Sequence, residues 1–504
     1  MKTLKLFTLF ALLLAAGGVT MRAQGLKKIA DLRYWSDIVT EQPDGYNVDA
    51  NGNVEISTAE GLAWLISTVN GLNGCEPDNF DGRTVTLTED LTMIGDTVNY
   101  LQDFQNYIFE PIGNRANRFM GTFDGAGHKI NWLVVYVYEA YYNRLDVGLF
   151  GYLYHGTVKN LTLNKGCFVA GPVMDEELFW FDGGFAGISD SLSLVENCVY
   201  QMGAENMPSE AYGTAGGLVG LNRNSTVRNC AYWMDWPSLH IALYGGGLVG
   251  RNLCEGGYAD AVVENCCIYG KLLGSYSVKD VGGLVCFNET RANDVGKKAI
   301  VRNCYSLLLG DLFGFDEQGC IVANNSEGSL VEYCYADLTM QQEHQTGLFG
   351  SNNGEVRYCT SFIPYQGEGL LSEPVVFEGN ETDNLLKALN IWVSLQDESI
   401  PYRTWISGYP SPYFGEYWWN VPESEVKPKA IAYPNPTNGV LFVRLPQCDS
   451  PTINKTAYRI TNLLGQTLQT GNLTGDHQPL DVSCLPAGMY LLTVDGATVK
   501  FVVE

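Results

Sequence analysis

The sequence predicts an all-β protein, in which a right-handed parallel β-helix with helical caps is followed by a small C-terminal β-sandwich. Two observations predict the β-helix: a short strand-like phrase recurs along most of the chain, and the charge at one of its positions alternates in sign. Helical periodicity is absent from the recurring stretch, which argues against solenoids built from helices. A change in composition near residue 420 marks the start of the second part.

The recurring phrase consists of an aliphatic residue, a charged residue, Asn or Tyr, and usually Cys. Its charged positions are Lys159, Glu196, Arg228, Glu264, Arg302, Glu332 and Arg357. Equivalent positions of a parallel sheet stack about 4.8 Å apart, and opposite charges on neighbouring strands stabilise the pair by about 0.2–1 kcal/mol. The phrases are therefore predicted to be successive strands of one parallel sheet, with Val and Cys inward and the charged residue outward.

A glycine-rich phrase, most complete as G-G-L-V-G-x-N, precedes each charged phrase. Its copies begin at Val147, Gly183, Gly216, Gly246, Gly282, Gly319 and Gly347. Glycine permits tight corners and close backbone approach, and its Asn is expected to adopt a left-handed bend. One coil then holds a strand, a polar bend, a second strand and a variable loop. The spacing of 25 to 38 residues between charged positions fits one coil per repeat.

The glycine-rich phrase resembles the GLUG motif of bacterial surface proteins, notably those of the Bacteroidetes. The stretches 109–113 and 119–130 are similar to the usual opening of such solenoids. The resemblance covers roughly residues 45 to 410 and implies an architecture rather than an activity, because the motif is a folding device.

Helices are expected at both ends of the solenoid. Residues 57–60 form a capping box before an amphipathic segment that ends near Val69, and this helix would cover the otherwise open edge of the first coil. A second helix is expected at 383–390 to close the other end. The aromatic-rich segment 402–419 would complete that cap.

The N-terminus and the overall charge limit which compartment and which partners are possible. Residues 1–23 have the basic start, apolar run and small-residue exit of a secretory signal peptide. No later apolar run reaches the length of a membrane span. A net charge of −25 argues against nucleic acid or anionic membrane as a partner. Residues 24–420 are assigned to the capped β-helix, which is expected to be monomeric.

A polar linker at 421–429 leads to an all-β module at 430–504. The module resembles the type A C-terminal sorting domain of the type IX secretion system, which is immunoglobulin-like. The matching residues include Pro434, Asn435, Pro436, Gly465, Gly488, Tyr490 and Lys500. The resemblance implies that the type IX machinery is a partner. It also implies export followed by outer-membrane attachment or extracellular release. A bridge between Cys448 and Cys484 inside the module is left open.

The cysteines of the charged phrase occupy one position on successive coils. They are Cys198, Cys230, Cys266, Cys304, Cys334 and Cys359. A ladder of reduced inward thiols is the favoured interpretation, because stacked side chains run parallel rather than converging. Disulfides between coils and a metal array remain as alternatives.

Catalytic and cofactor motifs are scarce. The sequence lacks H-E-x-x-H, G-x-S-x-G and P-loop patterns. The pair Asp124 and His128 is interpreted as part of a turn rather than a catalytic pair. Residues 49–55 have calcium-like oxygen spacing but also contain Asn-Gly, a strong hairpin signal. No cofactor is predicted, with calcium at this segment left open.

Two sets of residues are candidates for a site. Glycosidases and lyases on β-helices need paired carboxylates on one exposed face; Asp182, Asp190 and Asp235 are considered for this role, but solvated loop acids are the simpler interpretation. The ligand-binding candidates are Trp180, Trp233 and Trp236, in two aromatic clusters that either bind a ligand or fill the core. The sequence favours a non-catalytic adhesin or a solenoid that binds an extracellular glycan or a host or bacterial surface protein. A secreted polysaccharide lyase or glycoside hydrolase on the same scaffold is the alternative.

Overall fold

The computed structural model forms two compact units, Met1–Trp418 and Trp419–Glu504. In the first unit it describes residues 33–93, 107–137, 146–170, 181–202, 209–211, 213–234, 239–241, 243–270, 272–274, 278–291, 296–308, 316–338, 347–363, 369–407 and 413–414. In the second unit it describes residues 431–433, 437, 439–444, 456–462, 467–473, 477–486, 488–494 and 497–503.

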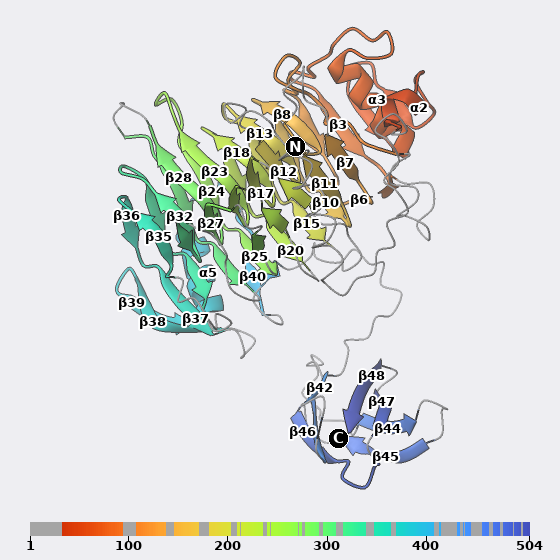
Figure 1. The fold of residues 1–504 in the computed structure, drawn as a ribbon, viewed down its shortest axis with the longest axis vertical. Coiled ribbons are helices and arrows are strands. Elements are labelled where there is room, and N and C mark those ends of the chain that lie inside the picture. Colours follow the sequence, from red (N-terminus) through yellow and green to blue (C-terminus); the bar gives the residue numbers. More distant parts are fainter. Residues whose placement is uncertain are drawn as a thin grey trace, which may run out of the picture. The chain divides into compact units, whose positions relative to one another are not determined.

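The first unit is a parallel β-solenoid, which confirms the predicted fold class (Figure 1). The charged phrase forms an 11-stranded sheet, here the charge-ladder sheet. Its strands are β1 (Tyr46–Val48), β2 (Val54–Ile56), β3 (Thr84–Leu87), β5 (Thr122–Asp124), β9 (Thr157–Lys159), β14 (Leu194–Glu196), β19 (Thr226–Arg228), β24 (Ala261–Glu264), β29 (Ala299–Arg302), β33 (Leu330–Glu332) and β36 (Glu355–Arg357). Only the β1–β2 pair is antiparallel.

A second 11-stranded sheet follows the corner after each charged phrase and is here called the aromatic sheet. Its strands are β4 (Leu91–Thr92), β6 (Lys129–Asn131), β10 (Thr162–Asn164), β15 (Val199–Met202), β20 (Ala231–Met234), β25 (Cys267–Gly270), β30 (Tyr305–Leu308), β34 (Tyr335–Asp337), β37 (Thr360–Ile363), β38 (Leu370–Phe377) and β39 (Asn380–Asn384). Strands β38 and β39 form an antiparallel hairpin that extends the sheet past the last coil.

The glycine-rich phrase joins a five-stranded sheet to a seven-stranded sheet. The five strands are β12 (Phe181–Gly183), β17 (Thr214–Gly216), β22 (Tyr244–Gly246), β27 (Asp280–Gly282) and β31 (Gln318–Gly319). The seven are β8 (Phe150–Tyr154), β13 (Ala186–Asp190), β18 (Val219–Arg223), β23 (Val249–Cys254), β28 (Val285–Thr290), β32 (Val322–Asn325) and β35 (Phe349–Asn352). A Cβ on Gly282 would lie 1.8 Å from the carbonyl oxygen of Val285, so the predicted close approach is confirmed.

A further five-stranded sheet completes the coils in the described part of the chain. Its strands are β7 (Val134–Val137), β11 (Cys167–Ala170), β16 (Ser209–Ala211), β21 (Leu239–Ile241) and β26 (Leu272–Gly274). All of its pairs are parallel. Every coil therefore stacks on its neighbours through the same ladder of main-chain hydrogen bonds.

Two asparagine ladders run along the solenoid, and one corrects an expectation. The left-handed bend is made by the Asn of the charged phrase, with φ of 53° at Asn160 and 51° at Asn265. The Asn of the glycine-rich phrase was expected to make that bend, but it lies within a strand. There Asn252 donates from Nδ2 to Oδ1 of Asn288 at 2.9 Å, with both residues fully buried. Each ladder links buried amides across coils, although the Oδ1 atoms of Asn222 and Asn303 have no hydrogen-bond partner.

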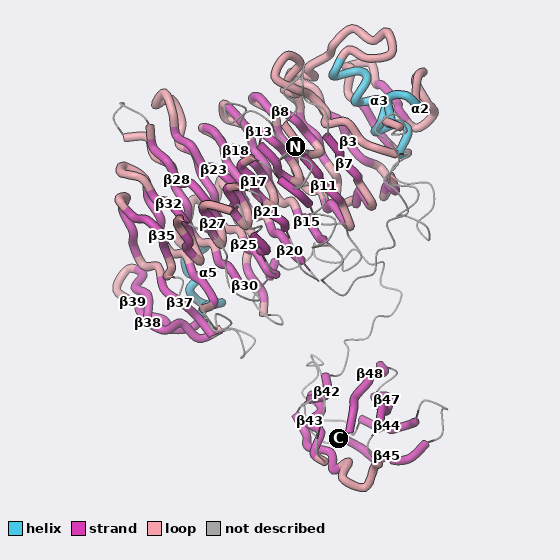
Figure 2. The backbone as a smooth tube through the Cα atoms, in the orientation of Figure 1, coloured by secondary structure: helices cyan, strands magenta, loops and turns pink. Residues whose placement is uncertain are grey.

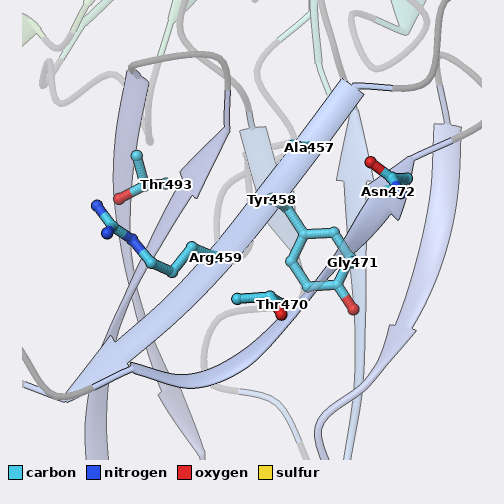
Figure 3. Close-up of a pocket in the computed structure, with 7 residues that line it drawn as sticks. All are labelled: Ala457, Tyr458, Arg459, Thr470, Gly471, Asn472 and Thr493. Carbon is cyan, nitrogen blue, oxygen red and sulfur yellow. The ribbon is translucent and has the colours of Figure 1, made fainter.

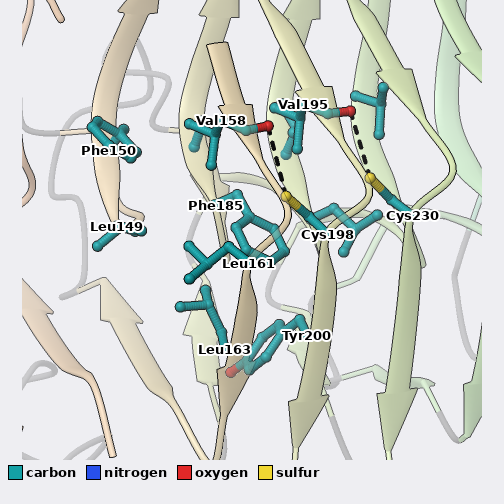
Figure 4. Close-up of a cluster of buried hydrophobic side chains, with 14 of the residues drawn as sticks. Leu149, Phe150, Val158, Leu161, Leu163, Phe185, Val195, Cys198, Tyr200 and Cys230 are labelled. Atoms are coloured by element: carbon teal, nitrogen blue, oxygen red, sulfur yellow. Dashed lines mark hydrogen bonds between the residues drawn. The ribbon is translucent and has the colours of Figure 1, made fainter. Parts of the chain in front are cut away.

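The core consists of aliphatic, aromatic and cysteine side chains from successive coils (Figure 4). The inward prediction for Val and Cys is confirmed, because Val195, Cys198 and Cys230 are fully buried. The Sγ atoms of Cys198 and Cys230 each approach a valine carbonyl oxygen of the preceding coil, at 3.7 and 3.5 Å. The six cysteines of the charged phrase are free thiols.

The helices are α2 (Trp35–Ile38), α3 (Ala59–Asn70) and α5 (Leu385–Ser394). Helix α3 is capped by Thr58, whose side chain accepts from the backbone of Gly61, and it packs on the first coils as expected. Helix α5 lies elsewhere than predicted. It packs against outward residues of the aromatic sheet, including Tyr305 and Tyr335, and so covers a side of the solenoid rather than its end. Strands β40 (Trp405–Ile406) and β41 (Tyr413–Phe414) follow it.

The second unit consists of two antiparallel sheets around one apolar core (Figure 2). One sheet contains β42 (Ile431–Tyr433), β43 (Val440–Arg444) and β46 (His477–Asp481). The other contains β45 (Thr467–Leu473), β44 (Thr456–Asn462), β47 (Gly488–Val494) and β48 (Ala497–Val503). The core joins them through side chains such as Leu441 and Leu492, both fully buried.

Candidate functional site

The charged positions stack in the predicted register. Glu264 lies opposite Arg228 on one side and Arg302 on the other. Its carboxylate is 3.5 Å from the Arg228 guanidinium and 2.7 Å from that of Arg302. The ladder continues at the N-terminal end, where Lys159 is 3.3 Å from Asp124. The alternation of sign is therefore a row of ion pairs between coils.

The middle of this row faces outward but is not exposed, which the sequence did not predict. Glu264 is only 3% exposed because helix α5 and residues 401–405, here called the strap, cover the middle of the ladder. The guanidinium groups of Arg302 and Arg228 lie over the rings of Trp392 and Tyr402, at 5.6 and 5.7 Å. A cation above an aromatic face is attracted by the ring quadrupole.

The strap is held by the corner asparagines. Asn265 donates from Nδ2 to the carbonyl oxygen of Arg403 at 2.9 Å, and its Oδ1 accepts from Nε1 of Trp405 at 2.7 Å. Asn229 donates to the carbonyl oxygen of Pro401 at 2.8 Å. Trp405 itself is 2% exposed. The segment expected to plug the end therefore closes a side of the solenoid and leaves the charged ladder unavailable to a ligand there.

Neighbouring aromatic residues of β20 lie on opposite faces of the sheet, because side chains alternate along a strand. In β20 the ring of Tyr232 points into the core, where it stacks on Tyr200 with ring centroids 5.0 Å apart. The next residue, Trp233, points outward, is half-buried, and stacks on Tyr269 with centroids 4.2 Å apart. The core interpretation therefore describes Tyr232, whereas Trp233 on the outer face stays a candidate for binding. Trp180 and Trp236 lie outside the described residues.

Trp233 belongs to a row that sequence reasoning missed. Residues in register on the outer face of the aromatic sheet form this amide–aromatic strip: Asn131, Asn164, Gln201, Trp233 and Tyr269. All are half-buried. Asn164 donates from Nδ2 to Oδ1 of Asn131 at 2.7 Å. The last four each stand four residues after a corner residue of the charged phrase, so an alignment of the repeats contains the signal.

Asp190 is not the solvated loop acid that the sequence favoured. It is 3% exposed at the end of β13, where its carboxylate accepts from the Tyr152 hydroxyl at 2.6 Å and from Arg223 at 2.5 Å. Burial alone would raise the pKa of Asp190, but the hydrogen bonds from Arg223 and Tyr152 outweigh it and lower that pKa. Burial also raises the pKa of Tyr152 to about 12.

Asp182 also departs from the loop-acid interpretation. It lies in β12, in register with Val147 and Ala215, and is 6% exposed. Neither carboxylate oxygen has a hydrogen-bond partner. Burial, with a smaller contribution from the negative charge of Asp146, raises the pKa of Asp182 well above its usual value. The third acid considered, Asp235, lies outside the described residues.

The turn interpretations fit the geometry. Asp49 accepts from the backbone of Asn51 and Asn53 at 2.7 and 2.9 Å, which closes the β1–β2 turn. Asp124 accepts from the backbone of Ala126 at 2.9 Å, and His128 lies 3.2 Å from Asp90 rather than beside Asp124. A polar depression of about 500 Å³ adjoins the first turn; it is lined by Asn47, Val48, Asp49, Asn53, Val54, Glu55, Thr84 and Thr86. Within the described residues, no group of His, Cys, Asp and Glu is arranged to hold a metal ion.

The second unit has a shallow depression of about 530 Å³ on its four-stranded sheet (Figure 3). Its lining residues are Ala457, Tyr458, Arg459, Thr470, Gly471, Asn472 and Thr493. The described sorting residues Gly488, Tyr490 and Lys500 are not among its lining residues. Tyr490 is buried and donates its hydroxyl to the carbonyl oxygen of Pro486 at 2.6 Å.

The other sorting residues divide into two groups. Gly488 pairs with Val503, and Lys500 pairs with Leu491, so both belong to the β47–β48 ladder. Pro434, Asn435, Pro436 and Gly465 lie outside the described residues, as does Cys448. The Cys484 thiol is exposed.

A solved structure described as a "putative immunoglobulin A1 protease" from Bacteroides ovatus is similar at 17% identity and a TM-score of 0.45, covering 73% of this chain and 93% of that chain. Among curated proteins, none matches the sequence. No described helix is long and apolar enough to cross a membrane. Residues 431–504 match the family described as the secretion system C-terminal sorting domain. This chain therefore carries a type IX sorting domain, which indicates use of that secretion machinery, export, and a cell-surface or extracellular location.

Proposed function

We propose that the solenoid is a non-catalytic glycan-binding protein and that the amide–aromatic strip is its binding surface. The observation that supports the proposal is the register of the strip, which places amides and aromatic rings in line on successive coils. Side-chain amides donate to and accept from sugar hydroxyls, while an aromatic face packs on the apolar face of a sugar ring. A repeating spacing of about 4.8 Å suits an extended chain of sugars better than a single small molecule.

The acidic residues support binding rather than hydrolysis or elimination. Glycoside hydrolysis requires one carboxylic acid and one free carboxylate flanking the bond. Asp190 has its oxygens engaged by Arg223 and Tyr152, and Asp182 faces the apolar interior. With its pKa raised to about 12, the Tyr152 hydroxyl is a poor base for elimination.

The direct test is binding of the purified protein to a panel of neutral and acidic polysaccharides, with and without calcium. We expect retention of at least one polysaccharide. Affinity should fall by about ten-fold in the Trp233→Ala variant, and it should also fall in Gln201→Ala. Tyr258→Ala is the matched control, because this tyrosine is 53% exposed but lies in the loop between β23 and β24, away from the strip.

The same incubation distinguishes binding from catalysis. New reducing ends or unsaturated sugar products released by the protein would overturn the non-catalytic assignment. Unchanged affinity in Trp233→Ala, with the variant folded as judged by circular dichroism, would remove the strip from the binding surface. A lowered melting temperature without loss of affinity would indicate that Trp233 acts in packing alone.

A further inference from the structure

The C-terminal end of the solenoid exposes its interior. In the inner coils the inward residues are fully buried, as for Leu248, Val263 and Cys266. In the last coil, by contrast, the inward side chains are partly exposed; they are Leu348, Phe349, Val356 and Cys359. The expectation that a helix plugs this end is therefore wrong, because α5 packs on the side of the molecule. The apolar core is therefore partly exposed at this end of the solenoid.

The same coil also presents unpaired strand edges. Strand β36 pairs with β33 and strand β35 pairs with β32, and within the described residues no strand lies on their other side. The aromatic sheet differs, because its last coil strand, β37, is covered by β38. A free edge next to exposed apolar side chains is a template for pairing with another chain.

The sequence of β36 identifies the chain that fits. The strand consists of Glu355, Val356 and Arg357. An antiparallel partner related by a two-fold axis through Val356 places Glu355 of each copy opposite Arg357 of the other. Val356 then meets its own counterpart. The edge is thus charge-complementary to itself, as an isologous interface requires.

The neighbouring residues agree with this register. Continuing it by one residue places Gly354 opposite Tyr358, whose side chain is 48% exposed, so the residue without a side chain faces the large ring. Glu355 and Arg357 contact each other along the outer face of the free strand, and they also lie 3.2 Å from Lys298 and 3.9 Å from Glu332, respectively. The Glu355 side chain nevertheless stays 40% exposed. The Arg357 side chain is 49% exposed.

We propose that a second copy of this chain docks on the open C-terminal end of the solenoid, through antiparallel pairing of β36 with its counterpart around Val356. The two open cores then cover each other, which removes Phe349 and Val356 from water. This differs from the monomer expected from the sequence. The proposal is independent of what the amide–aromatic strip binds.

Charge reversal tests the register directly. Sedimentation velocity of the purified full chain should show a reversible monomer–dimer equilibrium. Arg357→Glu and Glu355→Arg each place like charges opposite one another at both ends of the strand pair. Each should weaken dimerisation by about ten-fold or more. An equimolar mixture of the two variants should recover the dimer, because every Glu then faces an Arg.

The control variant is Arg291→Glu. Its side chain has the same 49% exposure as that of Arg357 but does not lie on the edge, so its dimer should match the wild type. A wild-type protein that stays monomeric at all concentrations overturns the proposal, whether or not a different protein binds this end. So does a dimer that both charge reversals leave intact. Failure of the mixture to recover the dimer overturns the proposed register.

Discussion

Glu264 and Arg302 form an ion pair on adjacent strands of the charge-ladder sheet, with 2.7 Å between Oε2 and Nη2. Glu264 is 3% exposed, whereas the Arg302 side chain is 27% exposed. The pair is therefore shielded from water on the carboxylate side and partly hydrated on the guanidinium side. Its geometry comes from the register of the coils, and its burial comes from the helix and strap that cover it.

Replacing Glu264 with Ala should destabilise the solenoid by about 2–3 kcal/mol. A fully buried pair costs about 3–5 kcal/mol when one partner is removed, and partial hydration of Arg302 reduces that cost. Urea unfolding measures the change. The matched control is Lys159→Gln near the N-terminal end of the same ladder, whose side chain is 36% exposed and which should leave the unfolding midpoint unchanged. Equal effects of the two variants would contradict the role assigned to burial.

Removal of the Trp405 side chain should detach the strap. Trp405→Ala is expected to lower the free energy of unfolding by about 3–5 kcal/mol, as for other large buried aromatic residues. Trp405→Phe keeps most of the packing and loses the hydrogen bond to Asn265. Because Oδ1 of Asn265 still accepts from Asn303 at 2.8 Å, the Phe variant should lose only about 1 kcal/mol. Calorimetry of both variants measures the two losses, and a larger loss for Trp405→Phe than for Trp405→Ala would contradict this prediction.

The stacked thiols should resist alkylation. Burial is the main cause that raises the pKa values of Cys266, Cys304 and Cys334 well above the usual range for thiols, so almost no thiolate forms at these three positions at about pH 8. Iodoacetamide on the native protein should modify Cys484, which is exposed, before any ladder thiol. After unfolding without a reductant, all ladder thiols should react. Ladder thiols that stay unmodified in the unfolded chain would indicate disulfides between coils.

Asp182 should make stability fall as the pH rises. Its pKa is raised in the folded state, so the folded chain holds the proton more tightly than the unfolded chain. Stability is then greatest below the unfolded pKa and declines toward the folded pKa. Asp182→Asn should remove this decline, so the variant should be more stable than the wild type at about pH 7 and lose that advantage at about pH 4.

Asp190→Asn is the control for that experiment because its linkage has the opposite sign. The pKa of Asp190 is lowered in the folded state, so its contribution is present above the unfolded pKa and is lost as the pH falls through the folded pKa. The variant should be destabilised at about pH 7 and less so in acid. Parallel pH profiles for the two variants would contradict the environments assigned to Asp182 and Asp190.

Much of the solenoid could be predicted from the sequence because its determinants are periodic. The alternating sign from Lys159 to Arg357 specified which strands are neighbours and in what register. The inward Val and Cys followed from the same pattern. The corner was assigned to the wrong asparagine, since both candidates are turn-forming residues and only the backbone shows that Asn265 bends while Asn252 lies in a strand.

The site could be predicted only in part. An amphipathic segment predicts a helix but not the surface that receives it, so α5 was expected at the end of the solenoid and lies along its side. Trp233 was recognised as aromatic, whereas Gln201 was not considered because a single amide gives no signal until coils are aligned. The burial of Asp182 could not be predicted, because it depends on which face of β12 carries the side chain. The glycine-rich corner after β12 shows no alternation of apolar and polar residues that would indicate this face.

The alternating ladder restricts how this protein changes length in evolution. Deletion of the coil that contains β24 would bring Arg228 beside Arg302, and duplication of a single coil would place two residues of like charge in contact. Gain or loss of two adjacent coils preserves every attractive neighbour. Homologous solenoids should therefore differ in length by even numbers of coils, unless a substitution has reset the sign.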